Sequence, residues 1–323
     1  MAKMLVQDGE KVRVLARSSS KFDNLQGVEC EKVIGDLRDE ESLERAVEGV
    51  SLVYHCAADY RLWAPRIEDL YENNVNGTRN LLQACAAKHV PRAVVTSSVA
   101  AVGIPKGGGV GNEDTPVCLD DMIGHYKRTK FLAEREAFKA AEQGQDVVIV
   151  NPSTPIGDGD IKPTETGKII TRFLNGGMPA YVNTGLNLAD VNDVCRGHIV
   201  AAQKGQSGRR YILGGFDMTL KEILDVLADI TGLKAPSVQL PLWFAYIVGL
   251  ADTLVSTQIL HKAPSVPLEG VKMARKLMYF SWERAKKELG YQPQQPRAAL
   301  ERAVQWFIDH GYAPETPKVK KSV

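Results

Sequence analysis

The sequence predicts an α/β fold in which a doubly wound parallel sheet is followed by a smaller, mostly helical part. Short apolar runs alternate with helix-length segments from Val12 to Leu213. This alternation is typical of βαβ units, because parallel strands need a crossover connection between them. From Asp217 onward helical patterns dominate, with prolines breaking the chain between them. With 323 residues, the chain is long enough for one large or two small domains.

Each apolar run is expected to form one strand of the parallel sheet, and each amphipathic segment one covering helix. Residues 1–9 indicate the second half of a helix, with Gly9 as its stop, since glycine readily takes the left-handed conformation that ends helices. The expected strands are 12–16, 30–34, 51–55, 93–97, 146–150 and 210–213, and the expected helices are 42–48, 69–88 and 126–141.

The expected sheet lacks its first strand. Dinucleotide-binding sheets normally open with a strand, a glycine-rich turn and a helix whose N-terminus holds the pyrophosphate. No such segment precedes Val12, and the glycine-rich stretch 106–111 follows a strand without opening a helix. We therefore expect stretch 106–111 to be a loop. The absent strand would lie between strands 12–16 and 51–55.

Composition excludes several classes of protein. The net charge is +1, which gives no sign of a nucleic-acid partner. The five cysteines form no CxxC pair, which favours reduced thiols and a cytoplasmic location. No His, Cys, Asp and Glu cluster has metal-ligand spacing. The longest apolar run, 242–251, is shorter than the roughly 20 residues of a membrane span and is expected to be a buried or interfacial helix.

Three residues carry the predicted chemistry. Tyr126 and Lys130 are four apart, so they share one face of a helix. The ammonium is expected to favour the phenolate and to lower the pKa of Tyr126 from about 10. Ser98, or alternatively Ser97, lies at the end of the strand 93–97 and can hydrogen-bond the same substrate oxygen. This set suits proton transfer coupled to hydride transfer at a carbonyl or a secondary alcohol carbon.

The chain resembles an extended short-chain dehydrogenase/reductase of the NAD-dependent epimerase/dehydratase family. Within that family it is similar to the hopanoid-associated sugar epimerases and, more distantly, to the dihydroflavonol 4-reductases. The segments that carry the resemblance are 35–39, 55–63, 74–82, 96–98, 126–134, 151–157 and 288–291. The resemblance implies a Rossmann-like sheet and a bound NAD(P). It also implies that Tyr126 is the proton donor and acceptor, that Lys130 contacts the nicotinamide ribose, and that Ser98 holds the substrate oxygen.

The cofactor is expected to be NADP, with NAD left open. Arg17 ends the strand 12–16, where an acidic residue would favour NAD by bonding the ribose 2′-hydroxyl. No acid is present there, and Arg17 can pair with a 2′-phosphate. By resemblance, Asp36 and Leu37 contact the adenine. The predicted cofactor residues are Arg17, Asp36, Leu37, Ala57, Ala58, Asn74, Tyr126, Lys130, Pro152 and Ser153.

The predicted substrate residues are Tyr60, Arg61 and Trp63, which should lie over the nicotinamide. Their rings and charge suit a sugar nucleotide or a phenolic ring. The dinucleotide-binding domain is expected at 1–158 with about 187–215, truncated at its front. The substrate-binding part is expected at 159–186 and 216–312, and residues 313–323 are expected to be a disordered tail.

Three functions remain after the sequence has been considered. The first is an NADP-dependent carbonyl reductase, and the second is an NAD-dependent epimerase of nucleotide sugars. The third is a non-catalytic or inactive remnant, because the phosphate-binding turn is missing. The expected partner is a small-molecule substrate. The exact substrate and the oligomeric state, with a homodimer as one option, stay open.

Overall fold

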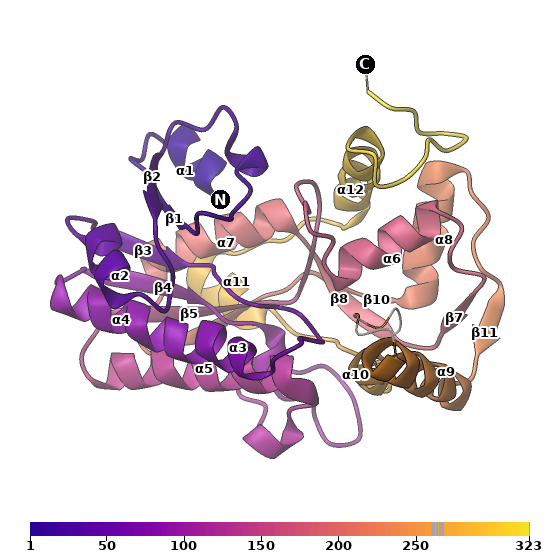
Figure 1. The fold of residues 1–323 in the computed structure, drawn as a ribbon, viewed down its shortest axis with the longest axis horizontal. Helices are drawn as coiled ribbons and strands as arrows, with labels where there is room; N and C mark the ends of the chain where they lie inside the picture. The colour runs from indigo at the N-terminus through magenta and orange to yellow at the C-terminus, as the bar shows by residue number, and fades with distance from the viewer. Residues whose placement is uncertain (260–261, 263, 265–267, 323) are drawn as a thin grey trace.

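The core of the molecule is a parallel sheet with strand order β3-β4-β5-β9 (Figure 1). The structure is a computed structural model that describes residues 1–259, 262, 264 and 268–322. The strands are β3 (Leu52–His55), β4 (Arg92–Thr96), β5 (Val147–Pro152) and β9 (Arg210–Leu213). Buried apolar side chains of β4 and β5 pack on both faces of the sheet, as expected for parallel strands that helices cover on each side.

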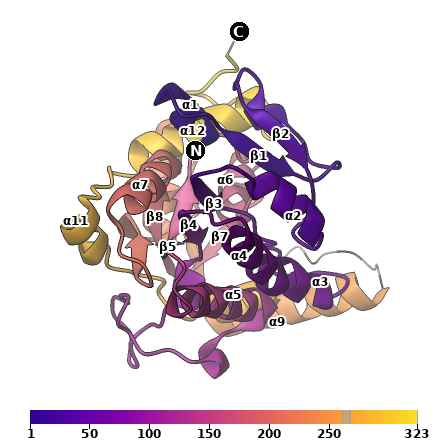
Figure 2. The ribbon, with the colours of Figure 1, turned by 90° about the vertical axis from the view of Figure 1, so that its left-hand side faces the viewer.

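Helices lie on both faces of this sheet (Figure 2). Buried side chains of α4 (Gly77–Ala87) and α5 (Gly124–Glu142) pack on one face, with α2 (Glu40–Val47) beside α4. Side chains of α7 (Val191–Lys204) and α11 (Glu283–Leu289) pack on the other. Asp39 caps α2 by accepting a hydrogen bond from the Ser42 N–H. This is the doubly wound α/β architecture that the sequence predicts, and the fold class is confirmed.

The front of the sheet is a separate two-stranded piece. Strands β1 (Arg13–Ala16) and β2 (Glu31–Ile34) pair in parallel with each other, preceded by the short helix α1 (Ala2–Gln7). Gly9 follows α1 with a φ of +85°, which matches the predicted helix stop. Within the described residues β1 and β3 are not paired with each other. The described strands therefore form two separate parallel sheets, β1-β2 and β3-β4-β5-β9.

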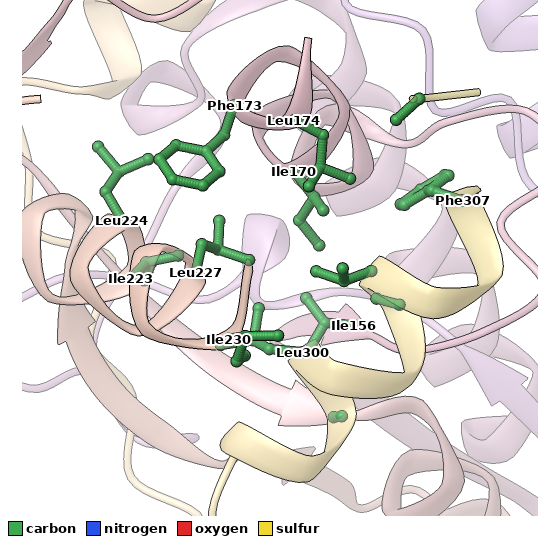
Figure 3. Packing of buried hydrophobic residues seen from close by; sticks show 14 of the residues in the cluster. Ile156, Ile170, Phe173, Leu174, Ile223, Leu224, Leu227, Ile230, Leu300 and Phe307 are labelled. Carbon is green, nitrogen blue, oxygen red and sulfur yellow. The ribbon is translucent and has the colours of Figure 1, made fainter. Parts of the chain in front are cut away.

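A second core lies beside the sheet and contains more strand than predicted. Strand β8 (Gly185–Asp190) pairs with β6 (Thr154–Ile156) and β10 (Phe216–Thr219), and β7 (Ala180–Val182) pairs with β11 (Val238–Leu240). Around them pack α6 (Glu165–Leu174), α8 (Leu220–Thr231) and α12 (Arg297–Asp309). Figure 3 shows their buried side chains, including Phe173, Leu227 and Phe307, meeting between the three helices.

The predicted helix 69–88 is three consecutive pieces. A short α3 (Glu68–Tyr71) leads into the π-helical turn η2 (Glu72–Asn76) and then α4. Such turns often occur at functional sites, and this one carries Asn74. Short 3₁₀ turns make up η1 (Asp23–Leu25), η3 (Val99–Ala101) and η4 (Leu119–Asp121). The remaining helical elements are α9 (Leu242–Leu254), the π-helical η5 (Val255–Ile259) and α10 (Leu268–Met273).

The end of the chain, for which the sequence predicts a disordered tail, makes hydrogen bonds with α8 and α12 in the structure. The Lys318 N–H donates to the Thr231 carbonyl at the end of α8 (3.0 Å), and the Ser322 N–H donates to Asp309 on α12 (2.7 Å). Thr316 is buried. The short polar composition hides these local bonds from sequence inspection. No helix among the described residues is long and apolar enough to cross a membrane.

Candidate active site

The predicted catalytic residues meet at the carboxyl end of β4. Lys130 on α5 donates a hydrogen bond from Nζ to the Thr96 carbonyl, the last residue of β4, over 2.8 Å. Ser98 follows two residues later, and its hydroxyl bonds the Tyr126 side chain from the first turn of α5. In open α/β sheets, ligands bind beyond this edge. The fold thus brings all three side chains to the edge where a dinucleotide would lie.

The pKa of Tyr126 is shifted in the direction opposite to the predicted one. Burial raises the pKa of the phenol, and the hydrogen bond with Ser98 lowers it only in part. The prediction that the pKa of Tyr126 is lowered is therefore wrong. Lys130 directs its ammonium to the Thr96 carbonyl, and burial of the phenol is the largest influence on the Tyr126 pKa.

Lys130 is a buried cation with only 5% of its surface exposed. Burial lowers its pKa to about 8, while the charges of Glu134 and Cys56 act in the opposite direction. The ammonium is therefore mostly charged at neutral pH and loses its proton a few pH units earlier than an exposed lysine. Such a depressed pKa is common where a lysine takes part in proton chemistry.

A buried polar network fixes Ser98 and α5 relative to each other. Asn151 of β5 donates from Nδ2 to the Ser98 carbonyl (3.0 Å) and to Glu134 Oε2 on α5 (2.5 Å). Arg210 of β9 completes the network by pairing with Glu134 Oε1 at 2.8 Å. Sequence reasoning missed Glu134 and Arg210. Glu134 lies one helical turn after Lys130, and this i,i+4 spacing was the available signal.

The predicted adenosine-side residues gather at the ends of β1 and β2. Arg38 holds the pKa of Asp36 below its usual value through a side-chain hydrogen bond (3.2 Å), and the more distant charge of Arg17 adds to this. Arg17 itself is exposed at the end of β1. Leu37 packs against Gly77 of α4, and its carbonyl accepts a hydrogen bond from Asn80 (3.0 Å).

Ala57 and Ala58 lie just beyond β3, and Ala57 is exposed. Small exposed residues leave room for a ligand backbone to approach. Asn74, a predicted cofactor contact, uses its side-chain amide for hydrogen bonds within the protein. Its amide donates to the Asp59 carbonyl (2.8 Å) and to Thr129 of α5 (2.9 Å), and it accepts from the Asp59 N–H (2.6 Å). Asn74 thus ties the loop after β3 to the helix that carries Tyr126.

The expected nicotinamide end offers free polar atoms. The hydroxyl oxygens of Ser97 and Ser153 are buried at the ends of β4 and β5 with no hydrogen-bond partner within the described chain. Buried polar groups are nearly always paired, so these hydroxyls fit the polar edge of a bound nicotinamide. Pro152 beside them is buried. His55 bonds Thr78 (2.8 Å), and burial lowers its pKa to about 3, so it is a neutral structural residue.

The predicted substrate residues form a loop that bridges the two parts of the molecule. The Tyr60 hydroxyl donates to the Lys162 carbonyl (3.1 Å). Arg61 is paired with Asp59 through Nε and Oδ1 (2.8 Å), so its charge is largely neutralised. Trp63 is partly buried. Among the residues that the structure describes, no group of three His, Cys, Asp or Glu side chains could hold a metal ion.

Comparison with known proteins assigns the family. Residues 1–214 match the sequence model of the NAD dependent epimerase/dehydratase family. The chain belongs to this family. It is 48% identical to the "Putative dihydroflavonol 4-reductase" of Synechocystis over 97% of this chain and 92% of the relative. It is 34% identical to "Sterol demethylase protein B" of Methylococcus capsulatus, over 96% and 95% respectively.

The fold agrees with a solved structure. A nucleoside-diphosphate-sugar epimerase from Pseudomonas aeruginosa superposes with a TM-score of 0.80 at 26% identity, covering 97% of this chain and 94% of that one. The family and its relatives therefore show that the chain is an NAD(P)-dependent enzyme of the extended short-chain dehydrogenase/reductase type.

Proposed function

We propose that this enzyme transfers a hydride between NAD(P) and a carbonyl or secondary alcohol carbon, with Tyr126 as the general acid and base. The observation that carries the proposal is the meeting of Tyr126, Ser98 and Lys130 at the carboxyl end of β4. The cofactor supplies or accepts the hydride when it is bound. The side chains of this protein handle the proton that must move with it.

Each of the three residues has a separate task in this proposal. Reduction of a carbonyl leaves an alkoxide, and the Tyr126 hydroxyl gives it a proton. Ser98, already hydrogen-bonded to Tyr126, holds the same oxygen and orients it. The buried Lys130 ammonium stabilises the phenolate that forms, because charges attract more strongly away from bulk water. Oxidation of an alcohol runs through the same steps in reverse.

NADP is the proposed cofactor, with NAD as the alternative that the family description supports. Arg17 is exposed at the end of β1, and no acidic residue lies between Ala16 and Lys21. A guanidinium pairs well with a phosphate. The unpartnered hydroxyls of Ser97 and Ser153 are the proposed contacts at the nicotinamide end.

The proposed reaction is a reduction or oxidation in which the cofactor is consumed. The relative named for sterol demethylation supports a ring-bearing alcohol or ketone as the substrate. The pairing of Arg61 with Asp59 also leaves less free charge for an anionic sugar nucleotide. Epimerisation of a nucleotide sugar is the second candidate. The family description and the sugar-epimerase structure support it.

One experiment distinguishes these candidates from each other and from an inactive protein. The purified chain is titrated with NADPH and NADH, then screened against aldehydes, ketones, sterols and nucleotide sugars. A reductase or dehydrogenase changes the absorbance at the nicotinamide band in step with product. An epimerase interconverts sugars without net change in that absorbance. Absence of both cofactor binding and turnover would support the inactive remnant and refute the proposal.

A further inference from the structure

Helix α9 turns most of its large apolar side chains toward solvent, the reverse of the usual arrangement for a surface helix. Apart from Leu242 at its start, its side toward the protein carries small or polar residues, namely Ala245, Gly249, Asp252, Thr253 and Ser256 in the turn that follows. The outward side carries large apolar residues, with Trp243 at 65% and Ile247 at 55% exposure. The exposed set is Trp243, Phe244, Tyr246, Ile247, Val248, Leu250, Leu254, Val255 and Ile259. We call this set the α9 face.

A helix on the surface of a water-soluble domain normally turns its apolar stripe inward. Contiguous exposed apolar surface of this kind marks an interaction site. The sequence predicts a buried or interfacial helix here, and the structure shows that it is not buried. The inward side of α9 contacts α10, where the Leu268 N–H bonds the Thr253 hydroxyl (3.2 Å). Figure 1 shows α9 and α10 together at the margin of the molecule.

The exposed charges on the stretch of chain that forms α9 and α10 have one sign. Between Leu242 and Leu277 the exposed charged residues of the described chain are Lys262, Lys272, Arg275 and Lys276. The two acids of this stretch, Asp252 and Glu269, are both partly buried. An apolar helix bearing aromatic side chains and flanked by cations suits the boundary of a bilayer that contains anionic lipid.

From these observations we infer that the α9 face docks this enzyme on the surface of an anionic lipid bilayer. Helix α9 has 13 residues and is about 20 Å long, too short to span the roughly 30 Å hydrocarbon layer. It therefore lies in the plane of the interface. A second copy of the chain fits this face less well, since a two-fold contact would bring the same cations toward each other.

Helix α10, which packs against the inward side of α9, borders the active site. Glu269 of α10 accepts a hydrogen bond from the His125 N–H, next to Tyr126. Gly270 of α10 approaches Leu62 of the predicted substrate loop. Docking through α9 thus sets the approach to the site close to the lipid surface. The inference does not depend on the reaction that the site catalyses.

Vesicle co-sedimentation tests the inference. Wild-type protein is mixed with phosphatidylcholine vesicles with and without phosphatidylglycerol, at low and high salt. The variant Trp243→Ser/Phe244→Ser/Ile247→Ser should bind anionic vesicles at least about tenfold more weakly, a change of about 1.4 kcal/mol. The matched control Ile34→Ser/Ile67→Ser/Val110→Ser changes exposed apolar residues elsewhere and should bind as wild type does.

A second variant keeps the test decisive if the triple variant misfolds. Lys272→Glu/Lys276→Glu should weaken binding to anionic vesicles severalfold and remove most of its salt dependence. Brominated lipid should quench Trp243 fluorescence, and Trp243→Phe should remove that quenching. Absence of vesicle binding by wild type would overturn the inference. So would equal loss in the control, or concentration-dependent self-association that the triple variant abolishes without any vesicle binding.

Discussion

Replacing Lys130 with methionine should raise the stability of the protein while abolishing its activity. Methionine has a similar length and volume but carries no charge. Depressing a lysine pKa from 10.5 to about 8 means that burying the ammonium costs roughly 3 kcal/mol at neutral pH, at about 1.36 kcal/mol per pH unit. Loss of the 2.8 Å hydrogen bond to Thr96 takes back about 1 kcal/mol. The net gain expected at pH 7 is about 2 kcal/mol.

The pH dependence of the unfolding free energy separates the contribution of Lys130 from those of the other titratable groups. Because its folded pKa lies below its unfolded value, the unfolded chain binds more protons between pH 8 and 10.5. The cost of burial is therefore complete below pH 8 and is relieved as the pH rises through this window. From pH 7 to 9.5 wild type should gain about 2 kcal/mol of unfolding free energy relative to Lys130→Met.

Urea unfolding at pH 7 and pH 9.5 measures this difference. Groups common to both proteins, including Lys127, whose pKa burial also lowers to about 8, cancel in the comparison. Lys139→Met, on the exposed side of the same helix, serves as the control and should follow wild type at both pH values. Parallel pH dependence of wild type and Lys130→Met would refute the claim that Lys130 is a buried ammonium.

Two further predictions concern the network behind the site and the choice of cofactor. Glu134→Gln should lower the free energy of unfolding by about 3 kcal/mol, because it leaves the Arg210 guanidinium without its buried partner; urea unfolding measures this, and a loss under 1 kcal/mol would contradict it. Arg17→Glu should reverse a preference for NADPH over NADH, because a carboxylate repels the 2′-phosphate; fluorescence titration of both proteins measures this, and wild type that prefers NADH would contradict the assignment.

The sequence predicted the parallel sheet well because its strands are short, mainly apolar runs between clear turn signals. The spacing of Tyr126 and Lys130 likewise identified a helix face, since i and i+4 always meet there. The meeting of Ser98 with that face depends on the strand order and required the structure.

What the sequence could not predict depends on long-range contacts. The raised pKa of Tyr126 follows from how deeply its ring is covered, which the residues around it in sequence do not reveal. The contact of Arg210 with Glu134 joins β9 to α5 across 76 positions. The sequence also did not reveal that the large apolar residues of α9 face solvent, because a buried helix has the same apolar composition.

The most direct test of the central claim is the turnover of Tyr126→Phe beside its cofactor affinity. The substitution keeps the ring that packs in the site and removes only the hydroxyl that bonds Ser98. On whichever substrate the screen identifies, turnover should fall by about 10²–10⁴-fold. The dissociation constant for NADPH should stay within about threefold of wild type. A loss of turnover below about threefold would show that Tyr126 is not the proton donor.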